Sequence, residues 1–374
     1  MADLDSAANA STHPGKRART ESDAFIVVKS QDLWFPKGDI IIRTTSEAAV
    51  IPRTRMMYKV HKDILALHCT AFADIFGGPQ AAFEGVSEQD EGAPVMDLPD
   101  AEEDVSAFLK ALYFPTETKL HPGVLNPYLG GEKWNLIPSS YHGTLRLATK
   151  YDAAGIRRLI IEALLQEWPT VLGQWDRLRQ ALANTLPLVP EENHWSCYPS
   201  SGNMIRLAMD CNVPDALPSA FYDLSCAVED ERDDGLSLLT SKELCTFTTG
   251  QRALYTRFSN MCRDFSNGAC RSETCSAQGK SDCADVMGEL WQTVAAFQTV
   301  ASRPSDPLAW IGFLPQCVDA SGAALCSQCQ RWSKSEFIKM RKALWKELPG
   351  FFSLANSVTT SWGYECEDRG LYYP

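Results

Sequence analysis

The sequence predicts an α+β fold followed by an all-helical domain, and three observations support this fold class. Short, largely apolar runs at 39–43, 57–60 and 95–98 have the length of strands, and the first of them is rich in β-branched residues. Apolar residues at helical spacing occur between and after these runs, first at 64–76. After residue 168, strand patterns give way to helical stripes. Strands with helices grouped around them indicate α+β rather than a doubly wound parallel sheet.

The length of the chain predicts more than one domain. It has 374 residues, which is more than a single hydrophobic core usually serves. Residues 1–31 are rich in Ala, Ser, Thr and Asp and predict a disordered arm. Residues 32–168 then predict the mixed domain, and residues 169–374 a helical, cysteine-containing domain. Within the mixed domain, repeated Pro and Gly at 115–140 predict a long irregular insertion.

The charge balance and the pattern of apolar residues exclude several classes of protein. There are 35 Lys and Arg against 47 Asp and Glu, a net charge of −12, so the chain lacks the basic surface of a dedicated nucleic-acid binder. No apolar run approaches the ~20 residues of a membrane span, and the first twenty residues lack the apolar core of a secretory signal. We therefore expect an intracellular protein, nuclear or cytoplasmic. The cluster Lys16-Arg17-Ala18-Arg19 is either a nuclear import signal or a solvated basic patch.

Each element of the mixed domain has its own pattern. The runs at 39–43 and 57–60 predict a hairpin with a long, loose turn. The stripe at 64–76 predicts one amphipathic helix, which a Gly-Gly-Pro sequence ends. Further helical faces at 105–113 and 145–164 predict the helices that complete the domain.

Two segments of this domain, YKVHKDIL at 58–65 and FADIF at 72–76, resemble the core signature of BTB/POZ domains. The residues that stand in the places of the family's signature are Asp39, His61, Phe72 and Phe76. The resemblance covers about residues 32–168, and the whole chain looks like the BTB-domain proteins of filamentous and mushroom-forming fungi. It implies a small sheet with surrounding helices and a protein-interaction module with no chemistry of its own. We interpret His61, at a strand-to-helix turn, as a hydrogen-bonding residue of the fold rather than a base.

The resemblance also implies partners. Family members often form homodimers through the first helix and the N-terminal strand region, and the equivalent here, about 25–35, is short and weakly helical. Some recruit cullin-type ubiquitin ligases through a hydrophobic-x-Glu element, which Val86-Ser87-Glu88 matches. Two features depart from the family: Cys69 stands where serine is common, and the insertion at 115–140 is longer than usual. The predicted function is a non-catalytic protein–protein interaction protein, scaffold or regulatory. The alternative is a substrate adaptor of a cullin-type ubiquitin ligase.

Cysteines are the residues of the second half that are best suited to metal binding or redox chemistry. Of 13 in the chain, 12 lie at or after Cys197. Cys326 and Cys329 have the two-residue spacing that lets both thiolates reach one tetrahedral ion, and Cys270 and Cys275 offer a second pair. The one histidine of the second half, His194, lies far from them in sequence, so an all-cysteine site is predicted.

Three interpretations of these cysteines stay open: a structural zinc site, reduced packing cysteines, and a redox pair. The zinc hypothesis names Cys270, Cys275, Cys326 and Cys329 as ligands, with Cys262 and Cys283 as alternatives. A thioredoxin-like redox pair would open a helix within a βαβ unit, and no such strands are predicted near it. No cofactor other than zinc is expected.

The usual catalytic motifs are not found in the sequence. It has no G-x-G-x-x-G after a strand, no G-x-x-x-x-G-K-[ST], no H-E-x-x-H and no G-x-S-x-G. We therefore predict a non-enzyme with no catalytic residues. An enzyme whose residues converge only in space, in the helical half, is the further alternative.

Overall fold

The structure is a computed structural model that describes residues 25–45, 53–78, 88–115, 139–185, 200–227, 234–266, 271–276, 283–297, 306–320 and 324–363. The strands are β1 (Phe25–Trp34), β2 (Ile40–Thr45), β3 (Arg53–Val60), β4 (Gln89–Asp90) and β5 (Ala93–Leu98). The helices are α1 (Lys62–His68), α2 (Thr70–Gly77), α4 (Glu102–Tyr113), α5 (Ser139–Lys150), α6 (Ala154–Glu167), α7 (Leu172–Thr185), α8 (Ser201–Asp210), the short 3-10 helix η5 (Pro214–Ala216), α9 (Leu217–Cys226), α11 (Ser241–Ser266), α12 (Cys283–Phe297), α13 (Pro307–Ala320) and α14 (Ser327–Phe351).

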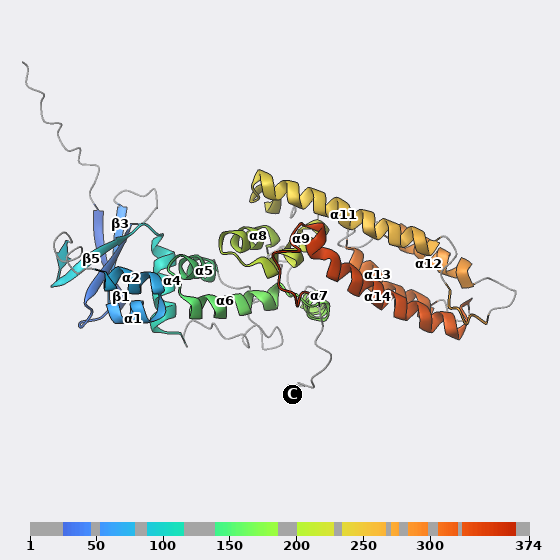
Figure 1. Ribbon diagram of the computed structural model, residues 1–374, viewed down its shortest axis with the longest axis horizontal. Helices are drawn as coiled ribbons and strands as arrows, with labels where there is room; N and C mark the ends of the chain where they lie inside the picture. Colours follow the sequence, from blue (N-terminus) through green and yellow to red (C-terminus); the bar gives the residue numbers. More distant parts are fainter. Residues whose placement is uncertain are drawn as a thin grey trace, which may run out of the picture.

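The molecule is elongated, with the sheet at one end and the long helices at the other (Figure 1). Helices α1, α2 and α4 lie beside the sheet, α5 and α6 continue from them, and α11 to α14 form a helical arm. The fold is α+β, as predicted. The cluster Lys16-Arg17-Ala18-Arg19 and most of the predicted insertion, 116–138, lie outside the described residues.

The sheet is mixed and has the strand order β1-β3-β2-β5-β4. The predicted hairpin of β2 and β3 is confirmed as an antiparallel pair. Strand β1 pairs parallel with β3, and β2 pairs parallel with β5. The sequence patterns predict three strands, and the structure has five because two strands lack a strong local signal.

The expected boundary of the N-terminal arm at residue 31 is wrong, because β1 already begins at Phe25. Its partner is not a neighbour in sequence, so the ladder that orders it is invisible to a local pattern. The second missed strand, β4, turns into β5 through Glu91 and Gly92, both with positive φ (45° and 77°). Two consecutive positive φ values are typical of a tight hairpin turn, which Gly at the second place favours.

The single helix predicted at 64–76 is two helices that Cys69 separates. Cys69 is extended, with φ −132° and ψ 114°, and its side chain is buried. The backbone N–H groups of Thr70 and Ala71, at the start of α2, donate to the carbonyl oxygens of Asp152 and Tyr151. The break therefore depends on a distant segment that satisfies the open end of α2, and the periodicity of the apolar residues cannot reveal it.

The strand-to-helix turn is held as expected by hydrogen bonds. The backbone N–H of His61 donates to the Tyr113 hydroxyl at 2.8 Å, and the His61 ring lies beside Phe35. Next to it, the N–H of Lys62 donates to Asp39 Oδ1 at 2.8 Å and so satisfies a free donor at the start of α1. Nδ1 of the His61 ring also lies 3.2 Å from the Tyr113 hydroxyl, so His61 is a hydrogen-bonding residue of the fold.

The buried core continues from the sheet into the helical half. Ile40 and Ile42 join this main core, whereas Ile41 faces a smaller cluster on the opposite side of the sheet. This alternation follows from the two-residue period of a strand. No break in the core marks the predicted boundary at residue 168, since Trp168 is itself a member of the main core.

Trp345 of α14 is the centre of an aromatic cluster in the helical half. Its ring packs against Trp175, Tyr222 and Trp362, with centroids 5.4, 6.4 and 5.5 Å away. Its Nε1 donates to the carbonyl oxygen of Thr170 at 2.9 Å, which joins α14 to the segment that precedes α7.

Gly250 allows α11 to lie close to the end of α14. A Cβ atom at this position would stand 2.2 Å from Cδ1 of Phe352, a buried ring that stacks on Phe221. We expect Gly250→Ala to lower the free energy of unfolding by about 1–3 kcal/mol, measured by urea denaturation. Gly155→Ala in α6 is the matched control, because nothing lies within 4 Å of its Cβ. It should leave stability unchanged or raise it, and equal losses in both variants would contradict the packing argument.

Candidate metal centre

Four cysteines meet near the far end of the helical arm, where the segment after α11, the start of α12 and the start of α14 come together (Figure 1). Cys275 lies in the 271–276 segment, Cys283 is the first residue of α12, and Cys326 and Cys329 lie at the start of α14. Their four Sγ atoms all lie within 4.8 Å of one another. Three separate segments thus converge on one point.

The spacing of the sulfur atoms fits a tetrahedral ion. Zinc–sulfur bonds of ~2.3 Å place two ligand sulfurs about 3.8 Å apart at a tetrahedral centre. The Sγ atoms of Cys275 and Cys326 are 3.9 Å apart, almost twice the ~2.05 Å of a disulfide bond. All four cysteines are free thiols in this arrangement. The geometry is that of a ligand set rather than of a pair of disulfides.

Local backbone structure aims each sulfur at the centre. Cys326 is the N-cap of α14, and its Sγ accepts a hydrogen bond from the N–H of Cys329 at 3.5 Å. The N–H of Cys326 in turn donates to Cys283 Sγ at 3.4 Å. A turn in which the N–H of Cys275 donates to the carbonyl oxygen of Ser272, at 3.0 Å, presents the remaining thiol. N–H groups at helix starts favour negative charge on sulfur.

The electrostatic environments of the thiols differ. The N–H of Cys329, followed by that of Ser276, lowers the pKa of Cys326 to about 5. Burial raises the pKa of both Cys329 and Cys283 above the usual range of a thiol. A divalent cation favours the thiolate form of every cysteine that it binds. It would therefore offset the free-energy cost of burying the negative charges of these thiolates.

The structure brings together three of the four cysteines that the sequence names as metal ligands: Cys275, Cys326 and Cys329. The fourth, Cys270, lies outside the described residues. Cys283, an alternative in the sequence prediction, completes the cluster. The other alternative, Cys262, lies within α11 outside this group of four, and burial raises its pKa to about 11.

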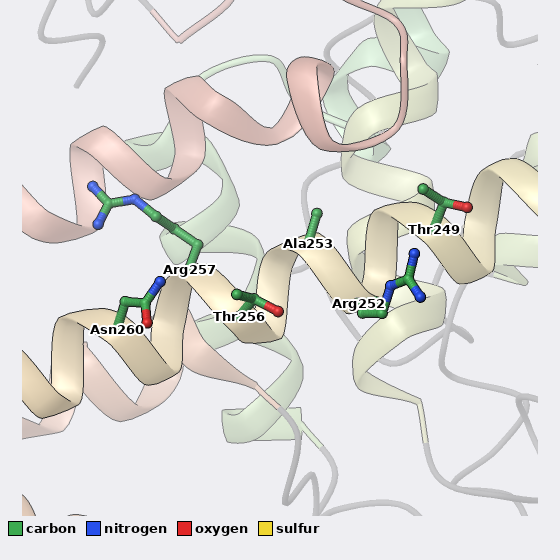
Figure 2. Close-up of a pocket in the computed structure, with 6 residues that line it drawn as sticks. All are labelled: Thr249, Arg252, Ala253, Thr256, Arg257 and Asn260. Atoms are coloured by element: carbon green, nitrogen blue, oxygen red, sulfur yellow. The ribbon is translucent and has the colours of Figure 1, made fainter.

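A separate shallow groove of about 400 Å³ lies on α11. Figure 2 shows its lining residues, which are Thr249, Arg252, Ala253, Thr256, Arg257 and Asn260. All belong to one helix, and Arg257 reaches away to a bidentate ion pair with Glu347 of α14 at 2.9 and 3.2 Å. The groove therefore brings together no groups from different elements that could act as an acid and a base.

The predicted cullin-binding element lies mostly outside the described residues. Of Val86-Ser87-Glu88, the structure describes Glu88, which is exposed and forms an ion pair with Arg43 at 2.7 Å. No helix in the described part of the chain is long and apolar enough to cross a membrane.

No family model matches this chain, and no curated protein or solved structure matches it either. The similarity to BTB/POZ domains therefore stays a prediction from the residues quoted above. The four-cysteine cluster, in contrast, is a feature of the structure itself.

Proposed function

We propose that this chain is a BTB/POZ-like protein-interaction protein that acts through the outer edge of its sheet. The observation that carries this proposal is on β1, the edge strand of the five-stranded sheet. Its residues Ile26, Val27 and Val28 are 53%, 54% and 37% exposed. Soluble proteins usually protect a strand edge with charge, Pro or a bulge. In β1 the charged Lys29 and the register shift come after residue 28, so the run 26–28 itself carries none of these protections.

The geometry of β1 suits strand addition. Residues 25–29 pair in regular register with 53–57 of β3, and no other strand of the described part of the chain pairs with the opposite edge of β1. Successive side chains of a strand point to opposite faces, so Ile26 and Val28 lie on one face and Val27 on the other. A polypeptide that adds as a further strand would bond to the open edge and cover apolar side chains on both faces.

The partner that we propose is a second copy of the chain. An edge that is open in one protomer is open in the other, and a two-fold arrangement satisfies both at once. The apolar character of 26–28 favours a partner edge of the same kind over an acidic or basic ligand. Self-association is also what the resemblance to BTB/POZ domains implies.

Zinc is the ion that we propose for the four-cysteine centre. Four thiolates in tetrahedral spacing favour zinc and make a closed structural site with no open position for chemistry. Its role would be to fasten the start of α12 and the segment of Cys275 to the start of α14. The helical arm would thereby keep a fixed shape and offer a second interaction surface, in addition to that of the sheet.

The substitution Val27→Asp tests the proposed sheet edge. We expect it to abolish self-association, because the carboxylate would be desolvated on the apolar face of the sheet that the partner covers, while stability changes by no more than about 0.5 kcal/mol at so exposed a position. Light scattering coupled to gel filtration measures the change from dimer to monomer.

The matched control is Ile338→Asp on α14, since Ile338 is also 54% exposed but lies far from the sheet along the molecule. It should leave the dimer intact. A natural chain that is monomeric throughout the concentration range, or a Val27→Asp variant that dimerises as well as the natural chain, would refute the proposed interface.

A further inference from the structure

Cys275 and Cys326, the two partly exposed residues of the cysteine centre, also have neighbouring sulfur atoms. Cys275 and Cys326 are half-buried, whereas Cys283 and Cys329 are buried. Between the two half-buried residues the Sγ–Sγ distance is 3.9 Å. An oxidant that arrives from solvent therefore meets this pair before it meets the other two thiolates.

We propose that the centre is a redox-sensitive clasp, in which hydrogen peroxide joins Cys275 to Cys326 and expels the zinc ion. This inference rests on the proposed zinc site and adds its regulation. The new disulfide would keep the Cys275 segment attached to α14. It would free Cys283, and with it the start of α12, from the common ion.

The chemistry balances with one peroxide molecule. One of the two thiolates attacks the O–O bond of hydrogen peroxide, which forms a sulfenic acid and releases hydroxide. The second thiolate attacks the sulfenic sulfur, forms the S–S bond and displaces the remaining oxygen as hydroxide. Two protons convert both hydroxides to water. The two sulfurs lose two electrons in total, peroxide gains them, and zinc is left with two ligands, too few to retain it.

Burial favours this pairing over a disulfide within the Cys326–Cys329 motif, because Cys275 and Cys326 are partly exposed and Cys329 is buried. To bond, the sulfurs of Cys275 and Cys326 must approach from 3.9 to about 2.05 Å. Cys275 lies in a non-helical segment that can make this movement, and Cys326 is an extended N-cap residue. Cys329, in contrast, is within the first turn of α14 and is fully buried.

The test uses the full chain loaded with zinc. One equivalent of hydrogen peroxide is added, zinc release is followed with a chromogenic chelator, and disulfides are mapped by mass spectrometry after alkylation. We expect about one zinc ion released per chain and a Cys275–Cys326 disulfide. Zinc that stays bound in a tenfold excess of peroxide, or release with Cys326–Cys329 as the disulfide, would overturn the inference. A chain that takes up no zinc at all would instead overturn the proposed zinc site.

A variant separates metal binding from oxidation. Cys275→His keeps a zinc ligand but removes the pair, so release by peroxide should slow at least tenfold. An unchanged rate would overturn the clasp. Cys245→Ser is the control, because Cys245 is an exposed cysteine of α11 outside the cluster, and its loss should leave the rate unchanged. If Cys275→His binds no zinc, disulfide mapping on the natural chain still decides.

Discussion

Removing the proposed zinc ion with a strong chelator should destabilise the helical arm by about 3–5 kcal/mol, and Cys329→Ser should have the same effect. Cys329 is fully buried at the start of α14, and three chain segments meet at its sulfur. Without the ion, the buried thiols lose the charge that compensates their thiolate form, and α12 and α14 lose a shared anchor. Urea unfolding, followed by far-ultraviolet circular dichroism, measures the loss.

The losses of stability caused by the chelator and by Cys329→Ser should not add, because both treatments remove the same ion. A chelator should therefore leave the stability of Cys329→Ser unchanged. Cys245→Ser, which alters an exposed cysteine outside the centre, should bind one zinc ion per chain and respond to the chelator like the natural protein. A natural chain that contains no metal by elemental analysis and is indifferent to the chelator would contradict the zinc assignment.

Trp345→Ala should be the most destabilising substitution in the hydrophobic core of the helical half, with a loss of about 3–5 kcal/mol. Its fully buried indole contacts Trp175, Tyr222 and Trp362, so its removal leaves a cavity that these rings cannot fill without losing their own packing. The change is measured as a lower midpoint of urea unfolding with an unchanged slope.

Two further substitutions on α14 separate the loss of ring packing from the loss of the hydrogen bond that the indole donates. Trp345→Phe keeps a ring but removes the donor to the Thr170 carbonyl, so it should cost clearly less than Trp345→Ala. Ile338→Ala, at a side chain that is 54% exposed, should change stability by no more than about 0.5 kcal/mol. A Trp345→Ala loss as small as that of Ile338→Ala would mean that the aromatic cluster does not support the fold.

Local patterns predict those elements whose partners are close in sequence. The hairpin of β2 and β3 is found where its two apolar runs predict it, because each run carries its own signal. Strand β1 could not be placed, since its ladder partner β3 is distant and its apolar run is short. The break at Cys69 is likewise set by carbonyl groups of Tyr151 and Asp152, which no pattern around residue 69 reveals.

A cluster of cysteines that could hold a metal ion was predictable from the sequence, but not all of its members were. The Cys-x-x-Cys spacing fixes Cys326 and Cys329 as a pair, because both lie in the first turn of one helix. For the other side of the site, Cys275 was named together with Cys270, and Cys283 only as an alternative. The cluster forms with Cys283 because α12 starts there and its first residue faces the start of α14, an arrangement that depends on tertiary packing.

The bond from Trp345 to the Thr170 carbonyl has a consequence for the order in which the protein is made. The two residues are 175 positions apart, and the N–H of Gly363 donates to the same oxygen at 3.0 Å. During synthesis, the sheet and its helices can assemble early, while the Thr170 carbonyl must wait until Trp345 has been made before it can accept this bond. Throughout that interval, Trp175 lacks its contact with the Trp345 ring, so chaperones that shield nascent aromatic surfaces can act at α7.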